Sequence, residues 1–168
     1  TGVSGGIVTI TLNAIRKGED GKETVVDFIT KNIEIKNIYT KQVNVNETIS
    51  RTEKYFVSLE DIPSNAKIQS ITVKLNGNMK SDQIVHRTYM SEDEKVSDSE
   101  IVNDSGKTNC DIRGSGSIVW DTSKFSDKMP VGQENSKYAF EIWWSDDSTQ
   151  SATIESIVIE YEWDGREI

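Results

Sequence analysis

Cysteine, histidine and proline are scarce in this sequence of 168 residues, which contains one, one and two of them respectively. The single cysteine, Cys110, excludes a disulfide within the chain. One cysteine and one histidine also exclude the usual structural zinc sites, which take four such ligands. A catalytic Cys–His pair would have to join Cys110 to His86, and nothing around either residue indicates an activated thiol. The sequence therefore predicts a protein that is not an enzyme.

Clusters of basic residues and long apolar runs are also missing. The net charge is -9 at pH 7, and the sequence pI is about 4.7. Proteins that bind duplexes neutralise phosphates with clustered Lys and Arg, so we expect no nucleic-acid partner. No apolar run approaches the ~20 residues of a membrane-spanning helix, so no membrane insertion is expected.

Alternation of apolar and polar residues with a period of two dominates the chain and indicates β-strands. Near the start, Val8, Ile10 and Leu12 alternate with threonine and asparagine. A charged, glycine-containing segment at residues 16–22 is typical of a turn, so residues 7–29 predict a hairpin.

The next segment is polar but keeps apolar residues on odd positions: Ile33, Ile35, Tyr39, Val43 and Val45. This pattern predicts an extended arm or a pair of edge strands, which interspersed lysines protect from aggregation. We therefore divide the chain into a hairpin with an extended arm at residues 1–45 and a sandwich domain at residues 46–168.

The remaining strands indicate an all-β fold, an antiparallel β-sandwich of jelly-roll-like type. A turn is expected at residues 76–78, and residues 103–117 are rich in loop-forming residues. The expected strands are residues 55–59, 71–75, 84–90, 118–120, 138–144 and 153–163.

An internal similarity links residues 66–75 to residues 152–161, with four identities in ten positions. In both segments the apolar residues change parity partway along. We interpret this change as a β-bulge or a corner through which the strand enters the sandwich, with Ile68 and Ile154 closing an open end. The two strands are then expected to be neighbours in one sheet, although β-rich sequences also resemble one another by chance.

Aromatic residues provide the most suggestive sign of ligand binding. Trp143 falls on the face of its strand opposite to the apolar face, where an exposed ring can stack on a sugar or anchor a protein partner. The alternative is that another segment covers it. Trp143 and Tyr89 are the candidate ligand-binding residues, whereas Trp120 and Trp163 are expected in the core.

Calcium is the one cofactor that the composition leaves open. Calcium takes hard oxygen ligands, which loop carboxylates and amides supply. No segment has the spacing of a calcium loop, and acidic loops on an acidic protein are usually solvated. The candidate calcium ligands are Asn103, Asp104, Asp111, Asp146 and Asp147.

Residues 62–73 resemble a string that recurs in jelly-roll-like β-sandwich modules of bacteriophage virion proteins. The matching positions are Ile62, Pro63, Ser64, Ala66, Ile68, Ile71 and Val73. Such proteins include tail, fibre and appendage components, some of which are similar to carbohydrate-binding modules. The resemblance covers residues 46–168 loosely and residues 55–77 best. It implies a sandwich fold and a place in a virion, and it carries over no binding residue.

Three functional hypotheses follow. The first is a non-catalytic structural or attachment module of a phage particle or phage-derived tail, located in the virion or outside the cell. It would act as a homo-oligomer, with other virion or tail proteins or a cell-surface glycan as partners. The second is a carbohydrate-binding module of a secreted or cell-surface protein. The third is a hydrolase, which would need His86 or a pair of carboxylates in a cleft.

Overall fold

Antiparallel strands form almost all of the regular structure: 70% of the described residues are in strands and 4% in helices. The computed structural model describes residues 6–49, 53–93, 96–142 and 151–165. Contacts divide the chain into two units, Thr1–Asn37 and Ile38–Ile168. None of the helical segments among the described residues is long and apolar enough to cross a membrane. The predicted all-β class is confirmed.

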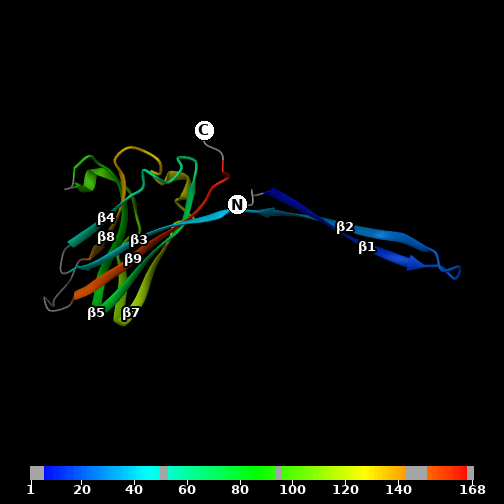
Figure 1. Cartoon of the computed structure of the whole chain (residues 1–168), viewed down its shortest axis with the longest axis horizontal. Helices are drawn as coiled ribbons and strands as arrows, with labels where there is room; N and C mark the ends of the chain where they lie inside the picture. Colours follow the sequence, from blue (N-terminus) through cyan, green and yellow to red (C-terminus); the bar gives the residue numbers. More distant parts are fainter. Residues whose placement is uncertain (1–5, 50–52, 94–95, 143–150, 166–168) are drawn as a thin grey trace. The chain divides into compact units, whose positions relative to one another are not determined.

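The first unit is a two-stranded ribbon of β1 (Gly6–Lys17) and β2 (Glu23–Ile35) (Figure 1). Its tip is closed by two hydrogen bonds, from Gly18 N–H to the Lys22 carbonyl and from Gly21 N–H to the Gly18 carbonyl. The predicted hairpin is confirmed, and it extends beyond residue 29. A β-bulge interrupts the pairing between Ala14 and Ile15.

The sandwich begins with β3 (Ile38–Ile49), which pairs with β9 (Ser151–Glu162) along the edge of a sheet. Tyr39, Lys41, Val43 and Val45 are half-buried, whereas Thr40, Gln42 and Asn44 are exposed. The unit boundary thus lies after Asn37 rather than after residue 45. The reason is that Val43 and Val45 of β3 pack against the sandwich core, so the whole strand belongs to the sandwich.

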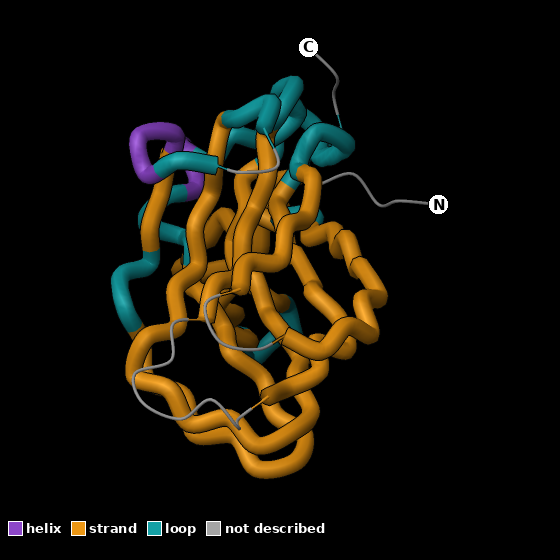
Figure 2. Tube along the Cα trace, turned by 90° about the vertical axis from the view of Figure 1, so that its left-hand side faces the viewer, coloured by secondary structure: helices purple, strands orange, loops and turns teal. Residues whose placement is uncertain are grey.

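The strands of the sandwich join in the order β3-β9-β5-β8-β4, with β6 and β7 both paired to β5. Figure 1 labels all of these strands except β6, and Figure 2 shows that strands make up most of the trace. Two short 3-10 helices, η1 and η2, lie in the connections. The bounds are β4 (Glu53–Ser58), β5 (Lys67–Met90), η1 (Asp98–Glu100), β6 (Ile101–Asp104), β7 (Thr108–Asp121), η2 (Ser126–Lys128) and β8 (Ser136–Ile142).

The long strand β5 joins the two halves of the seven-stranded sheet that forms the sandwich. Its first part pairs with β9 and β7, and its second part pairs with β8 and β6. The core therefore collects inward side chains from both parts of β5 and from the strands beside them. Its fully buried members include Ile68, Ile71, Val73, Leu75, Ile84, Tyr138, Phe140, Ile142, Ile154, Ile157 and Ile159.

The turn expected at residues 76–78 is wrong, because β5 continues through it. Gly77 has φ of +150° and lies against the backbone of Ser151 and Ala152 in β9. A Cβ atom built on Gly77 would lie 2.7 Å from the Ser151 carbonyl oxygen, so the close approach of the two strands requires glycine. An asparagine–glycine pair usually indicates a turn. In this protein it lies where two strands approach each other closely.

The loop-rich interpretation of residues 103–117 is also wrong, since most of this segment lies in β7. Cys110, Ile112 and Trp120 of β7 are buried, and the strand pairs with β5 from Ser70 to Ile84. Residues 114–117 within this strand are all glycine or serine, which concealed the alternation on either side of them. Trp120 lies in the core as predicted.

Both predicted bulges are confirmed. Pairing between β5 and β9 shifts register between Ile68 and Ser70, which leaves Gln69 as the extra residue. A second register shift lies between Lys74 and Leu75 of β5, which pair with Ser156 and Ile154. Glu155 is therefore the extra residue in β9. The two strands are neighbours, and Ile68 and Ile154 are both fully buried.

Candidate functional site

One face of the ribbon carries a row of exposed apolar side chains, which we call the apolar strip: Val8, Ile10, Leu12, Ile29 and Ile33. Val8 lies opposite Ile33 in the register, and Leu12 lies opposite Ile29. These side chains are 42–69% exposed. Strand alternation places them together because directly paired residues share a face.

The other face of the ribbon carries Thr9, Thr11, Asn13, Thr30 and Asn32 over the same length, together with one exposed apolar side chain, Phe28. Thr9 Oγ1 donates a hydrogen bond of 2.9 Å to Asn32 Oδ1, and the hydroxyls of Thr11 and Thr30 lie 3.2 Å apart. Over this length the strip face is therefore the more apolar of the two faces of the ribbon. A two-stranded ribbon is at best marginally stable in water unless its apolar face packs on something. The apolar strip is thus the first candidate interaction surface.

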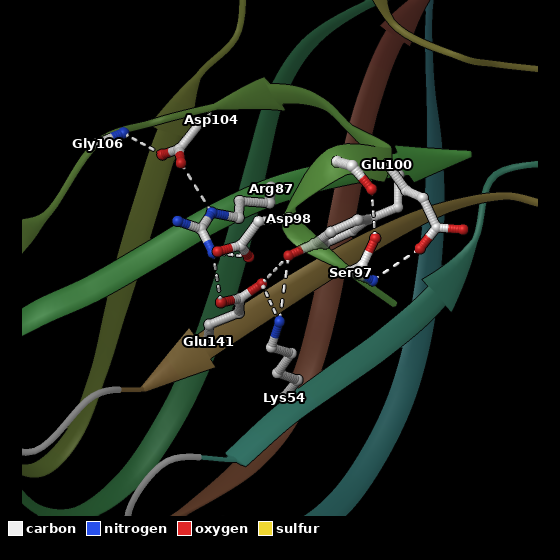
Figure 3. Close-up of polar contacts among 10 residues, drawn as sticks. Lys54, Arg87, Ser97, Asp98, Glu100, Asp104, Gly106 and Glu141 are labelled. Carbon is white, nitrogen blue, oxygen red and sulfur yellow. Dashed lines mark hydrogen bonds and ion pairs between the residues drawn. The ribbon is translucent and has the colours of Figure 1, made fainter. Parts of the chain in front are cut away.

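The sandwich carries a second notable feature, a set of charged and polar side chains on β4, β5, β6 and β8 (Figure 3). We call this set the Glu141 network: Lys54, Arg87, Tyr89, Asp104 and Glu141. Glu141 is fully buried at its centre. Arg87 Nη1 donates to Glu141 Oε2 at 3.1 Å, and Lys54 Nζ lies 3.4 Å from Glu141 Oε1.

The Glu141 network also holds the connection between β5 and β7 against the sheet. Arg87 Nε donates to Asp104 Oδ2 of β6 at 2.7 Å, and Arg87 Nη1 lies 3.7 Å from Asp98 Oδ1 of η1 (Figure 3). Asp104 in turn accepts a hydrogen bond from the Gly106 backbone at 2.6 Å. The buried Glu141 carboxylate is stable only because several donors and cations surround it. These contacts indicate a role in folding the sandwich.

Tyr89 lies inside the Glu141 network and is fully buried. Its hydroxyl donates to the Glu141 carboxylate, and its ring meets the Phe56 ring edge-on with centroids 6.2 Å apart. Burial and the hydrogen bond with Glu141 raise the pKa of Tyr89. The ring has no exposed face on which a ligand could stack, so Tyr89 is not a ligand-binding platform in this structure. Trp143 lies outside the described residues.

The predicted calcium ligands do not come together in the part of the chain that the structure describes. Asp104 is engaged by Arg87 and Gly106, and the Asn103 side-chain amide donates to Thr88 and to the Lys128 carbonyl. Asp111 lies 3.5 Å from Arg113. Among the described residues no group of three His, Cys, Asp or Glu side chains could hold a metal ion. Asp146 and Asp147 lie outside the described residues.

His86 and Cys110 are buried and have pKa values far from neutrality. His86 Nδ1 lies 2.7 Å from the Tyr138 hydroxyl, and the imidazole stacks on Trp120 with ring centroids 5.8 Å apart. Burial lowers the pKa of His86 to about 4. Burial, assisted by Asp111, raises the pKa of Cys110 to about 11. Both groups are therefore neutral at pH 7, which disfavours a thiolate nucleophile.

Sequence reasoning missed an aromatic cluster where β3 and β9 pair. The rings of Tyr39 and Tyr161 stack with centroids 5.8 Å apart, and Trp163 meets Tyr39 edge-on at 5.5 Å. The Trp163 indole donates to Asn65 at 2.8 Å, and Asn65 donates to Asp164 at 3.2 Å. All three rings are half-buried. The shared odd parity of Tyr39 and Val43 was the available signal, but the partner strand of β3 was unknown.

No family model matches this sequence, and neither does any curated protein. Among solved structures, one similar chain is a carbohydrate-binding module from glycoside hydrolase family 9 (Cel9A) of Ruminococcus flavefaciens FD-1. It has a TM-score of 0.49 and 18% identity, and the match covers 74% of this chain and 98% of that one. Another is the Tobacco streak virus coat protein, with a TM-score of 0.36 and 11% identity, covering 79% of this chain and 90% of that one.

Proposed function

We propose that this chain is a non-catalytic structural or attachment module of a phage particle or phage-derived tail. In this proposal the ribbon connects the protein to an assembly, and the sandwich is the domain that the assembly displays. The apolar strip carries the proposal, because five large apolar side chains on one ribbon face need a partner. The string at residues 62–73 directs the proposal to virion proteins.

The titratable groups of the sandwich support a non-catalytic role. A catalytic acid, base or nucleophile needs a pKa near its working pH and access to substrate. His86 and Cys110 are buried with pKa values of about 4 and about 11. Glu141 is buried and engaged by two cations and a tyrosine. These groups have the properties of structural side chains.

The test is whether the protein is part of a particle. An antibody raised against the purified chain is applied to particles isolated on density gradients from cultures of the organism that encodes it. We expect immunogold label on particles of regular shape and co-sedimentation of the chain with them. A chain found only in soluble fractions, with unlabelled particles, would overturn the proposal.

A second function, glycan binding, is favoured by the aromatic cluster of Tyr39, Tyr161 and Trp163 with its polar neighbour Asn65. Half-exposed rings beside amide groups are suited to stacking on a sugar. A glycan array with the wild-type chain tests it. Tyr39→Ala should abolish binding if the sugar stacks on this cluster. Trp143→Ala should abolish binding if the sugar stacks on Trp143, as the sequence predicted. Absence of binding to any glycan would reject this function.

A further inference from the structure

The ribbon offers a specific surface for one kind of partner. We propose that the part of the strip face from Ile10 to Ala14 of β1 and from Asp27 to Lys31 of β2 packs against the same surface of a second copy of this chain. The two ribbons stack face to face about a twofold axis that runs across the strands at the level of Leu12 and Ile29. The inference rests on the proposed function only in treating the ribbon as the element of assembly.

Charge is the first argument for a second copy. Between Val8 and Ala14 of β1 and between Asp27 and Ile33 of β2, the strip face carries two charged side chains, Asp27 and Lys31. They have opposite signs and lie two residues on either side of Ile29. Four strand residues separate them by about 13 Å, too far for an ion pair within one chain.

The twofold axis turns this separation into a match. It reverses the strand direction of the second copy, so the level of Lys31 in one ribbon becomes the level of Asp27 in the other. Each dimer then contains two such opposite-charge pairs, both formed between β2 strands. An isologous contact needs a surface that complements itself, and this arrangement meets that requirement.

Side-chain size is the second argument. Ile10 lies opposite Lys31 in the ribbon register, and Ala14 lies opposite Asp27. The same axis therefore places Ile10 of one copy over Ala14 of the other, a large residue over a small one. Leu12 and Ile29 meet their own counterparts at the centre. Alternation of large and small side chains across a contact allows close packing.

The exposed area suits a reversible dimer. The three large apolar residues of this surface, Ile10, Leu12 and Ile29, expose on the order of 300 Å² per copy, and Ala14, Asp27 and Lys31 add to this, so the contact stays below the roughly 800 Å² that each partner buries in a standard interface. A contact of this size is expected to dissociate in the micromolar range. Assembly into a particle would then raise the local concentration and complete the association.

Sedimentation equilibrium of the full chain at low ionic strength tests the charge match. We expect a monomer–dimer equilibrium. Lys31→Asp alone and Asp27→Lys alone each place like charges opposite one another twice per dimer and should weaken dimerisation roughly tenfold. The double variant Asp27→Lys with Lys31→Asp should recover wild-type affinity. A monomeric wild-type chain, or a double variant that stays weak, would overturn the inference.

A matched pair of variants tests the face. Ile29 and Phe28 are 69% and 65% exposed and point to opposite faces of the ribbon. Ile29→Thr should weaken the dimer, and Phe28→Thr should leave it unchanged. Equal weakening by both would reject the strip as the contact. Circular dichroism checks that each variant remains folded.

Failure of the inference can be told apart from failure of the proposed function. Particles that carry the label, together with a chain that never self-associates, would assign the ribbon to a different virion protein and reject the homotypic contact. A dimer that follows the charge rule in a chain absent from particles would support the contact and reject the virion assignment.

Discussion

The ribbon and the sandwich are built from the same alternating pattern with opposite results. Phe28 and Ile29 of β2 are 65% and 69% exposed, whereas Phe140 and Ile142 of β8 are fully buried. Both pairs lie in antiparallel strands of good β-propensity. The difference is the number of layers, since the two halves of the sandwich sheet cover each other and a single ribbon covers nothing. Alternation therefore marks a face that needs a partner without saying where the partner is.

The strongest test of this difference compares one change in both regions. Phe140→Ala leaves a cavity in the core and should lower the free energy of unfolding of the sandwich by about 3–5 kcal/mol. Phe28→Ala, on the exposed ribbon, should change it by less than about 0.5 kcal/mol. Urea unfolding followed by tryptophan fluorescence measures both. Similar losses would mean that the ribbon and sandwich unfold as one unit.

The next largest effect is expected in the Glu141 network. Glu141→Gln removes the negative charge that Lys54 and Arg87 surround and should destabilise the sandwich by about 2–3 kcal/mol. Glu160→Gln, on an exposed position of β9, is the control and should cost less than about 1 kcal/mol. Chemical denaturation of the two variants decides the point. A neutral Glu141→Gln would show that the network does not stabilise the fold.

His86 should make the sandwich sensitive to mild acid. Its pKa is about 4 when folded and about 6.5 when unfolded, so the unfolded chain binds more protons between these values. Stability from this group is present above pH 6.5 and is lost as pH falls toward 4, by about 2 kcal/mol from pH 7 to pH 5. His86→Phe should flatten the profile in this window. An equally steep profile in the variant would assign the effect to carboxylates.

The smallest effect concerns reactivity rather than stability. Burial of Cys110 and its pKa of about 11 predict slow modification by a thiol reagent at pH 8 in the folded chain. In a Thr11→Cys variant the new thiol on the ribbon should react within the mixing time while Cys110 remains protected. Rapid modification of Cys110 in the native protein would show that β7 opens easily.

Some structural features could be predicted from local sequence. The hairpin followed from the alternation of Val8, Ile10 and Leu12 around a charged turn. The parity changes after Ile68 and Ile154 predicted two β-bulges and the pairing of β5 with β9. These predictions succeeded because period and parity are properties of consecutive residues, which the backbone translates directly into faces.

Other features depended on contacts that the sequence does not encode locally. Asn76 and Gly77 suggested a turn, but the close approach of β9 kept Gly77 in a strand. Tyr89 was predicted to be an exposed platform, but its hydroxyl bonds to Glu141 of β8 and its ring packs against Phe56 of β4. Cys110 and Ile112 form part of the core in a stretch that glycine and serine had disguised.

The sequence by itself determined the all-β class, the hairpin ribbon, the acidic surface and the parity of the core strands. Only the tertiary structure decided that β5 joins the two halves of the sandwich sheet, that Glu141 is buried among Lys54, Arg87 and Tyr89, and that Tyr39 meets Tyr161. The physical reason is distance along the chain. A strand's faces are fixed by its own alternation, whereas a buried charge or an aromatic stack depends on strands that meet from far apart in sequence.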